Sequence, residues 1–583
     1  MSIVNLENFT FTYPGSNESV LNDVCLEIED GEVLGIIGPL GAGKTTLCKA
    51  IAGLAPSITG GEAAGEINVS KENQNRQHKD SSNNNVGQVG MVFEDYAAQL
   101  IQLKVFEEVK TPLLNRGLSP KEAENQAREL LHRVGLGGED IEKKRIWDLS
   151  GGQQQRLAIA ATLAMEPSIV ILDNVMDKLD PKGREQVRGI VTELNGHKTQ
   201  IIVDRDADFL LQKTQRLIVF VDGKAIASGL PEEIVKNQEL LERADIEPPI
   251  SLRLARALGM SQSPLTPEEF KQAYFANRMQ DPSSLVVRKH SRVEPPEAKR
   301  NFGNPVVCMQ DVTFCYSDDG PKVLEGINLT IHAGEVHAIV GRNGAGKTTI
   351  VKHIAGLVKP NKGRVTICGT DTREKSVPEL GLTVGTVLQN PDDQLSERTV
   401  KDEIGFPLKQ RQYERHGWFS KQKRYDDDYI EERISQVCEL VGITDLLDED
   451  PFLLPRGQRK LVTIAAALVV DPKVLLLDEP TIGLGATADR KIKQAIASLR
   501  EQGKAVLLVS NNDDFVAEIA DTANILEQGR IVLQGSVRQV FAEDNWARLA
   551  ELHIQPPQVA QLARSLNLKA LTCDDLVSQL SSK

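Results

Sequence analysis

Short, mostly apolar runs recur along the chain between longer polar stretches. VLGIIG at 33–38 and VHAIVG at 336–341 are typical of strands buried on both faces. Each is followed by a glycine-rich loop and then by a segment with helical spacing, TTLCKAIAGL and TTIVKHIAGL. Further apolar strands, IVILD at 169–173 and VLLLD at 474–478, again alternate with helical segments. This alternation predicts an α/β fold built on parallel core sheets.

The chain contains this pattern twice. GPLGAGKTTL from Gly38 returns as GRNGAGKTTI from Gly341, an offset of 303 residues, and IEPPISLRLARALG from Ile246 returns as IQPPQVAQLARSLN from Ile554. Self-similarity at a nearly fixed offset indicates two copies of one unit. The predicted parts are a first domain with a C-terminal extension at 1–260, a linker at 261–304 and a second domain with a C-terminal extension at 305–583.

Two segments occur in only one copy. Lys71–Gly87 is rich in Asn and Ser, which predicts a mobile loop without a role in chemistry. The second copy carries RQYERHGWFSKQKRYDDDYIEER from Arg411, a mixture of basic and aromatic residues. We interpret it as a solvated helical hairpin, with contact to a partner or a lipid surface as the alternative.

The composition narrows the class of protein. With 40% hydrophobic and 26% charged residues among 583, the chain resembles an ordinary globular protein, and its net charge of -14 argues against a nucleic-acid partner. Seven scattered cysteines without a C-x-x-C pair predict neither a disulfide framework nor a metal cluster, and favour a reducing compartment. The start shows no secretory signal, and no apolar run reaches the roughly 18 residues needed to span a bilayer. If the protein serves a membrane process, another chain is expected to span the membrane.

Both glycine-rich loops fit the pattern G-x-x-x-x-G-K-[ST]. Backbone N–H groups of such a loop can wrap around phosphates, while its lysine reaches the β- and γ-phosphates and its hydroxyl binds Mg²⁺. ATP with Mg²⁺ is therefore the predicted ligand. The predicted nucleotide-binding residues are Gly38, Gly41, Gly43, Lys44, Thr45 and Thr46 in the first copy and Gly341, Gly344, Gly346, Lys347, Thr348 and Thr349 in the second.

An apolar strand ends in an aspartate about 130 residues after each loop. Asp173 and Asp478 are placed to hold Mg²⁺ together with the loop threonines Thr45 and Thr348. Glu479 follows Asp478 directly and is predicted to position and deprotonate the attacking water. The matching residue of the first copy is Asn174, which cannot accept a proton.

The segment LSGGQQQR, 149–156, lies just before the first of these strands, and with it the chain resembles the ATP-binding-cassette superfamily over both halves. The resemblance implies two tandem P-loop domains, each with a parallel core sheet, an antiparallel β subdomain and a helical signature subdomain. It also implies that each ATP site pairs one copy's Walker motifs with the other copy's signature. Ser150, Gly152 and Gln153 would then contact phosphate. The second copy has LPRGQ at 454–458, which loses the serine hydroxyl and one N–H group.

The same resemblance assigns the remaining positions. Tyr13 and Tyr316 are assigned to stacking on adenine. An equally open interpretation is that each is a core tyrosine near the end of a strand. The other assignments, first copy and then second, are Glu94 and Gln389 in the Q-loop, Arg205 and Asn511 at the switch, and Asp180 and Gly485 in the D-loop. Gln389 is expected to help hold Mg²⁺.

When the motifs are paired across the copies, the positions that depart from the family pattern gather in one site, which predicts one competent and one degenerate site. The competent site combines Lys347, Thr348, Gln389, Asp478, Glu479 and Asn511 with Ser150, Gly152, Gln153 and Asp180.

The PDDQL-type Q-loop at 391–395 and the I-x-P-P extension of each copy are similar to those of the ATPases of energy-coupling-factor importers, which take up vitamins and transition-metal ions. That resemblance implies an ATPase on the cytoplasmic face of the cell membrane, with a transmembrane coupling protein and a small substrate-binding membrane protein as partners. The ATPase would not touch the transported substrate, which the sequence does not identify. The alternative is a soluble twin-cassette translation or ribosome factor, although the strongly basic linker or cysteine cluster of such proteins is absent.

Overall fold

The computed structural model describes residues 2–69, 88–176, 179, 181–280, 302–317, 320–411, 413–416, 420–423 and 425–581. The chain forms two compact units, Met1–Leu252 and Arg253–Lys583. The predicted loop at Lys71–Gly87 lies outside the described residues. In the segment from Arg411, the prediction of a helical hairpin is wrong: β16 (Tyr413–His416) and β17 (Ser420–Lys423) pair as antiparallel strands.

Each unit contains a six-stranded sheet with the same topology, which confirms the predicted parallel cores. The order in the first unit is β5 (Val89–Val92), β6 (Ile169–Asp173), β7 (Thr199–Val203), β3 (Val33–Ile37), β8 (Arg216–Val221) and β9 (Lys224–Gly229). The order in the second is β15 (Val384–Val387), β18 (Val474–Asp478), β19 (Ala505–Val509), β12 (Val336–Gly341), β20 (Thr522–Glu527) and β21 (Arg530–Ser536). Only the last strand of each sheet runs antiparallel to its neighbour. The carboxyl ends of β3, β6 and β7, and of β12, β18 and β19, therefore meet at one edge, where ligands of α/β folds bind.

A separate antiparallel sheet accompanies each core sheet. The first contains β1 (Ser2–Thr12), β2 (Leu21–Glu29) and β4 (Glu62–Val69), and the second β10 (Pro305–Phe314), β11 (Leu324–His332), β13 (Lys362–Ile367) and β14 (Thr370–Asp371). In the first unit one buried cluster includes Phe11 of β1, Leu47 of α1 (Lys44–Ile51) and Ile171 of β6. Because α1 packs against both sheets, its N-terminus is held at the glycine-rich loop. α12 (Lys347–Ile354) packs in the same way in the second unit.

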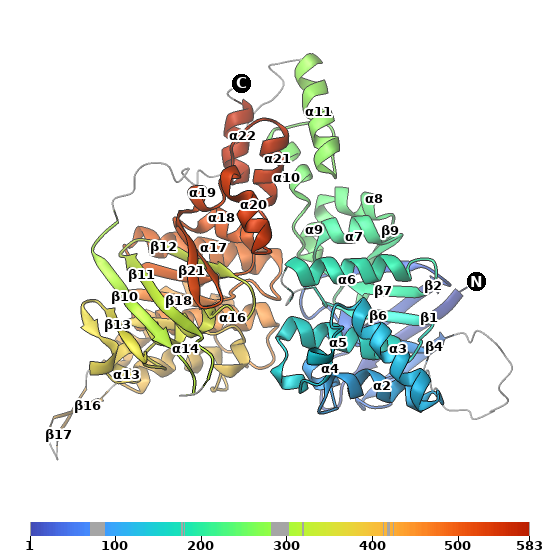
Figure 1. Ribbon diagram of the computed structural model, residues 1–583, viewed down its shortest axis with the longest axis horizontal. Helices are drawn as coiled ribbons and strands as arrows, with labels where there is room; N and C mark the ends of the chain where they lie inside the picture. Colours follow the sequence, from blue (N-terminus) through green and yellow to red (C-terminus); the bar gives the residue numbers. More distant parts are fainter. Residues whose placement is uncertain are drawn as a thin grey trace. The chain divides into compact units, whose positions relative to one another are not determined.

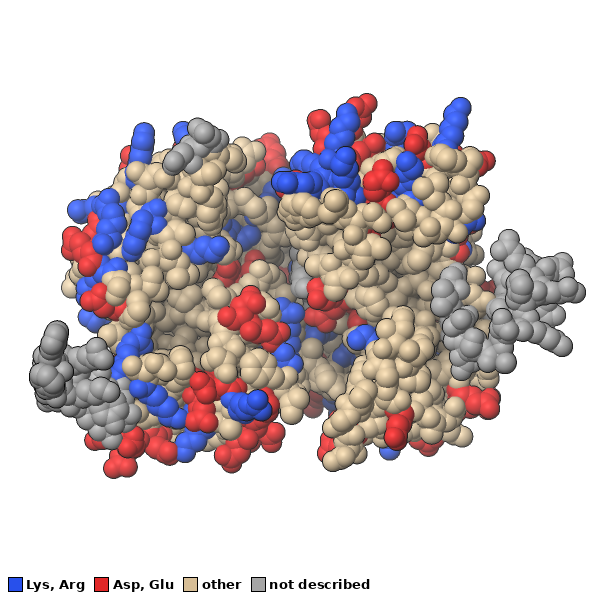
Figure 2. All heavy atoms as spheres, turned by 90° about the horizontal axis from the view of Figure 1, so that it is seen from below, with Lys and Arg blue, Asp and Glu red and all other residues tan. Residues whose placement is uncertain are grey.

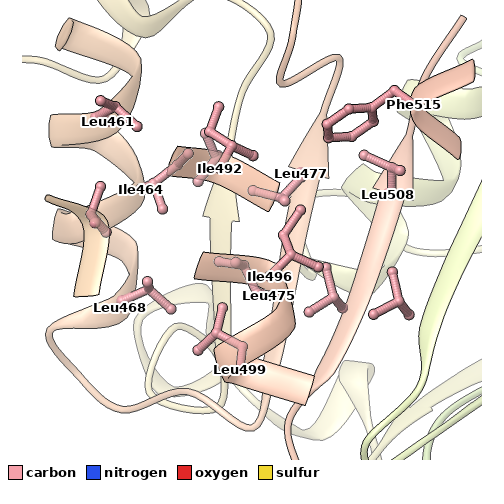
Figure 3. Packing of buried hydrophobic residues seen from close by; sticks show 14 of the residues in the cluster. Leu461, Ile464, Leu468, Leu475, Leu477, Ile492, Ile496, Leu499, Leu508 and Phe515 are labelled. Atoms are coloured by element: carbon pink, nitrogen blue, oxygen red, sulfur yellow. The ribbon is translucent and has the colours of Figure 1, made fainter. Parts of the chain in front are cut away.

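The remaining helices of the first unit, up to residue 213, are α2 (Val105–Asn115), α3 (Pro120–Arg133), α4 (Glu139–Glu142), α5 (Gly151–Ala164), α6 (Pro181–Leu194) and α7 (Ala207–Lys213). Those of the second unit, up to residue 519, are α13 (Val377–Leu380), α14 (Val400–Lys409), α15 (Asp427–Val441), α16 (Arg456–Leu468), α17 (Ala486–Glu501) and α18 (Asp513–Ile519). Figure 3 shows how α16, which begins within the altered signature, is held in place: Leu461, Ile464 and Leu468 face the cluster formed by β18 and α17. The signature helix and the strand that ends at Asp478 therefore share one core.

The C-terminal extensions consist of short helices. They are α8 (Pro231–Lys236), α9 (Gln238–Ala244), α10 (Ile250–Ala257) and α11 (Pro267–Gln280) after the first copy, and α19 (Val537–Val540), α20 (Trp546–Glu551), α21 (Gln558–Ser565) and α22 (Cys573–Ser581) after the second. Figure 1 labels these helices. Within the second unit, Arg253 of α10 donates to Glu518 of α18 at 3.3 Å, and the Tyr274 hydroxyl of α11 donates to the Leu580 carbonyl at 3.2 Å. Residues 253–280, which the sequence assigns to the first domain and the linker, thus pack with the second copy.

Asp514 of α18 takes part in this packing and predicts a pH dependence of stability. Its Oδ1 accepts the Gln558 backbone N–H at 2.7 Å, and burial raises its pKa to about 6, above the ordinary value of 3.8. Because the folded pKa is raised, the stabilising contribution is complete below about pH 4 and is lost as the pH rises through 6. We expect Asp514→Asn, which keeps the hydrogen-bond acceptor, to reduce the fall in Tm between pH 5 and pH 7.5. The loss of unfolding free energy that the Asp514 charge causes in the wild type is at most about 3 kcal/mol.

Glu518→Gln is the matched control for this measurement by scanning fluorimetry. Burial acts to raise the pKa of Glu518, but Lys493 and Arg253 outweigh it and hold that pKa below its ordinary value. Removing the Glu518 charge should therefore lower Tm at pH 7.5, whereas removing the Asp514 charge should raise it. Identical pH profiles for the wild type and Asp514→Asn would contradict the prediction.

Charged side chains of both signs are interspersed on the face of the molecule shown in Figure 2. The net charge of -14 is therefore not gathered there into one acidic field. Among the described residues, every helix is too short or too polar to cross a membrane.

Candidate active sites

The two glycine-rich loops have the backbone geometry of phosphate cradles. In the second unit, Gly346 has φ +105°, a left-handed conformation that favours glycine, and a Cβ on Gly341 would lie 2.3 Å from the Leu526 carbonyl oxygen. The chain can therefore take this path only with glycines at these positions. α12 begins at Lys347, directly after the loop, so its unpaired N–H groups point to the space enclosed by the loop. The loop before α1 repeats these features, with a Cβ on Gly38 only 1.9 Å from the Phe220 carbonyl oxygen.

Each loop lysine is buried and held by main-chain carbonyls. The Lys44 Nζ donates to the Gly38 and Pro39 carbonyls at 2.7 Å each. Burial, followed by the nearby Arg205 guanidinium, lowers the pKa of Lys44 to about 8. A bound phosphate would offset both effects, since it adds negative charge beside the two cations.

The lysine of the second copy belongs to a wider network. The Lys347 Nζ donates to the Gly341 carbonyl, to the Arg342 carbonyl at 3.2 Å and to the Asn511 Oδ1 at 2.8 Å. It also lies 4.0 Å from the Glu479 Oε1. The loop lysine, the switch residue and the glutamate thus meet at one point.

The loop threonine and the strand-end aspartate predicted to hold Mg²⁺ lie side by side in each unit. The Thr45 Oγ1 donates to the Asp173 Oδ2 at 2.7 Å, and Thr348 donates in the same way to Asp478. Burial raises the pKa of Asp173 to about 6 and also raises that of Asp478. A buried carboxylate beside a hydroxyl oxygen is a hard donor set that suits Mg²⁺. The residues fit the predicted ion.

Asn174 and Glu479 occupy equivalent backbone positions. Both have a left-handed φ, 50° and 47°, and their N–H groups donate to the Val203 and Val509 carbonyls at 2.9 and 2.8 Å. A left-handed conformation is uncommon for glutamate, and it is kept where the surroundings fix it. The two copies therefore differ here in chemistry and not in placement. The Asn174 amide donates to the Asp173 Oδ1 at 3.1 Å, whereas the Glu479 Oε2 accepts the Asn511 N–H at 3.0 Å.

Asn343 is a site residue that the sequence reasoning missed. Its Oδ1 accepts the Asn511 Nδ2 at 3.0 Å, so the loop itself holds the switch amide in the orientation that presents its oxygen to Lys347. The sequence signal that could have identified Asn343 is its polar side chain within the loop GRNGAGK, at the position where the first copy has Leu40. In the first unit the switch residue Arg205 is half-buried, and its Nη1 has no acceptor within the described part of the chain.

The two signatures begin their helices differently. Ser150 is the N-cap of α5: its side chain accepts the Gln153 N–H at 3.3 Å, and its own N–H donates to the Gln153 Oε1 at 3.0 Å. Gly151 and Gly152 form the half-buried first turn, which is suited to an anion. Pro455 is the N-cap of α16 and provides no side-chain cap. Asp180, the predicted D-loop residue, lies outside the described residues.

The predicted adenine-stacking tyrosines occupy matching places beside the loops. The Tyr13 hydroxyl lies 3.2 Å from the Thr46 Oγ1, and the Tyr316 hydroxyl lies 3.3 Å from the Thr349 Oγ1. Tyr316 is 58% exposed, which does not fit the alternative of a core tyrosine. Both rings also contact a core phenylalanine edge-on, at 4.9 Å between centroids.

Two phosphate cradles, each beside a buried carboxylate and accompanied by a signature helix in its own unit, define a tandem cassette ATPase. A family model described as ABC transporter matches residues 21–177 and 324–482, more than half of the chain. The chain belongs to this family of ATP-binding proteins.

The names of two relatives that match almost the whole chain agree with this class. A protein named "Putative ABC transporter ATP-binding protein" from Caldanaerobacter subterraneus is 33% identical over 580 residues, covering 98% of each chain. One of the same name from Methanosarcina mazei is 31% identical over 599 residues, covering 100% of this chain and 97% of the relative. The structure of cbiO1 from Clostridium perfringens, titled as part of the ABC transporter complex cbiONQ, is 29% identical, with a TM-score of 0.38 over 46% of this chain and 100% of that one.

Proposed function

We propose that this chain is the ATP-hydrolysing, energy-coupling subunit of a membrane importer for a vitamin or a transition-metal ion. One competent site would combine the second copy's Walker motifs with the first copy's signature, and the other site would be degenerate. The observation that carries the assignment of hydrolysis to one site is the difference between Glu479 and Asn174, two residues with the same backbone geometry of which only one can accept a proton.

In the competent site, the loop amides and Lys347 would bind the β- and γ-phosphates. Mg²⁺, held by Thr348, Asp478 and Gln389, would neutralise developing charge on the phosphate oxygens. Glu479 would orient the attacking water and take its proton. Asn511 would hold the γ-phosphate side of the site through its amide, which already contacts both Lys347 and Asn343. Ser150, Gly152 and Gln153, with Asp180, would close the site from the first copy.

The degenerate site would bind ATP without fast hydrolysis. Lys44, Thr45 and Asp173 retain the geometry for binding, and Tyr13 lies beside the loop. The Asn174 amide N–H donates to Asp173, and the amide oxygen of Asn174 is a much weaker base than the carboxylate of Glu479. Arg205 supplies a second cation near Lys44, which favours retention of a triphosphate.

A groove in the second unit supports a membrane partner. It encloses about 370 Å³ beside the Q-loop and is lined in part by Leu357, Val377, Phe406 and Arg411. Leu357, Val377 and Phe406 are 51%, 42% and 37% exposed, so apolar side chains line an accessible hollow. We propose that a segment of the transmembrane coupling protein docks there, on the cytoplasmic face of the membrane. The transported substrate would bind a separate small membrane protein and would not contact this chain.

Affinity purification from native membranes in mild detergent tests the proposal. We expect the tagged chain to carry along a transmembrane protein and a small integral membrane protein, identified by mass spectrometry. A Val377→Asp/Phe406→Asp variant should lose both while keeping its nucleotide affinity, and Glu479→Gln, whose groove is intact, should retain both. Recovery in the soluble fraction or with ribosomes would overturn the importer assignment and favour the translation-factor alternative.

A further inference from the structure

Lys460 is a buried lysine in the signature helix of the second unit. It is 2% exposed and stands in α16 where the first copy, in the matching helix α5, has Gln155. Lysine is rarely buried to this extent unless its charge is met by partners. The partners of Lys460 therefore indicate why this position differs between the copies.

The Lys460 ammonium donates to two consecutive carbonyls at the entry to the Q-loop. Its Nζ lies 2.6 Å from the Leu388 oxygen and 3.1 Å from the Gln389 oxygen. From the other side, the Gln394 Oε1 accepts the Leu388 N–H at 2.7 Å, while the Gln394 Nε2 donates to the Thr386 carbonyl at 2.9 Å. The chain that leaves β15 is thus held on both of its hydrogen-bonding sides just where Gln389 begins the loop.

The first unit keeps only half of this arrangement. Gln99 braces the loop entry as Gln394 does, through the Phe93 N–H at 3.1 Å and the Met91 carbonyl at 2.6 Å. Gln155 turns instead to the Val175 carbonyl, next to Asn174. The hydrogen bond of Gln155 therefore goes to the segment that follows β6 and not to a carbonyl at the entry of the loop that carries Glu94.

Charges around Lys460 make an ammonium tolerable there. Burial lowers its pKa to about 8, while the carboxylates of Asp478 and Glu479 act in the opposite direction. A glutamine could contact the same carbonyls with one amide, but it would bring no charge toward the two acidic residues.

We propose that Lys460 is a positioning residue that sets the Q-loop of the competent site. By holding the Leu388 and Gln389 carbonyls, it fixes the direction from which the Gln389 side chain reaches the Mg²⁺ position, and it links that loop to the signature helix of its own domain. The first copy lacks this link, so it belongs to the copy that also retains Gln389 and Glu479. The inference rests on the proposed role of Gln389 in that site.

The test is a double-mutant cycle of Lys460→Gln, which installs the residue of the first copy, with Gln389→Ala. We expect Lys460→Gln to lower kcat about tenfold, with KM for ATP within about twofold and the Mg²⁺ concentration for half-maximal rate raised several-fold. If Lys460 acts through Gln389, the double variant should match Gln389→Ala alone. Additive losses, or a lower kcat with an unchanged Mg²⁺ dependence, would overturn the proposal.

Two controls keep the outcome interpretable. Should Lys460→Gln not fold, as judged by Tm and ATP binding, Lys460→Arg takes its place in the same cycle with the same criteria. Glu479→Gln is measured alongside: if it leaves the rate intact, the proposed competent site itself is wrong. If Glu479→Gln abolishes the rate while the Lys460 variant matches wild type, only the role of Lys460 fails.

Discussion

Glu479→Gln is expected to remove most of the ATPase activity, a loss of about 10²- to 10⁴-fold in kcat, whereas Asn174→Ala should change it less than about twofold. Both residues have the same left-handed backbone and the same main-chain bond, so the two substitutions disturb equivalent places. Glu479 lies 4.0 Å from the Nζ of the loop lysine, and of the two residues only Glu479 has a carboxylate that can accept a proton. Glutamine has nearly the shape of glutamate but cannot act as a base.

Phosphate release under saturating Mg²⁺·ATP measures both variants, and ATP binding at equilibrium provides the control. Glu479→Gln should still bind ATP, since the loop and Lys347 are unchanged. Equal losses in the two variants, or a larger loss for Asn174→Ala, would contradict the assignment of catalysis to the second copy's glutamate.

Much of the fold could be predicted because its signals are local. The runs at 33–37 and 336–341 became central strands, and the following segments became α1 and α12. These predictions succeeded because a short, mostly apolar run next to a glycine-rich loop leaves few alternatives. The segment from Arg411 contains no apolar run of this kind. The prediction of a helical hairpin there is wrong, because the segment forms a β-hairpin.

The division between the units was harder to predict. The repeat placed Ile246 to Gly259 at the end of the first copy, yet Arg253 and Tyr274 contact α18 and α22 of the second unit. Repeats show which segments are similar in sequence. They do not show which segments pack together, because packing depends on partners distant in the chain.

The site shows the same limit. The loop glycines, Lys347 and Asp478 follow from spacing alone, since a phosphate loop needs those residue types in that order. Asn343 and Lys460 could not be found in this way. Their roles depend on the partners Asn511, Leu388 and Gln389, which lie 168, 72 and 71 residues away in the sequence.

Ser150→Asp is the variant that tests whether the first copy's signature serves the second copy's Walker motifs. Ser150 caps α5 and is exposed, so its hydroxyl can both stabilise the helix and meet a phosphate. Aspartate caps a helix as well as serine does, and Tm should therefore stay within a few degrees. Its carboxylate would face the γ-phosphate, however, and we expect kcat to fall about 10²-fold, the size of effect seen when a phosphate or oxyanion donor is lost.

Pro455→Asp is the matched substitution in the second copy. Pro455 provides no side-chain cap to α16, so aspartate there should stabilise the helix by about 1 kcal/mol. Because that signature would face the degenerate site, ATPase activity should change less than about twofold. If signatures acted within their own copies, the result would be reversed: Pro455→Asp would inhibit the copy that holds Glu479, and Ser150→Asp would affect only the copy that holds Asn174. The direction of this difference therefore decides between pairing across the copies and pairing within them.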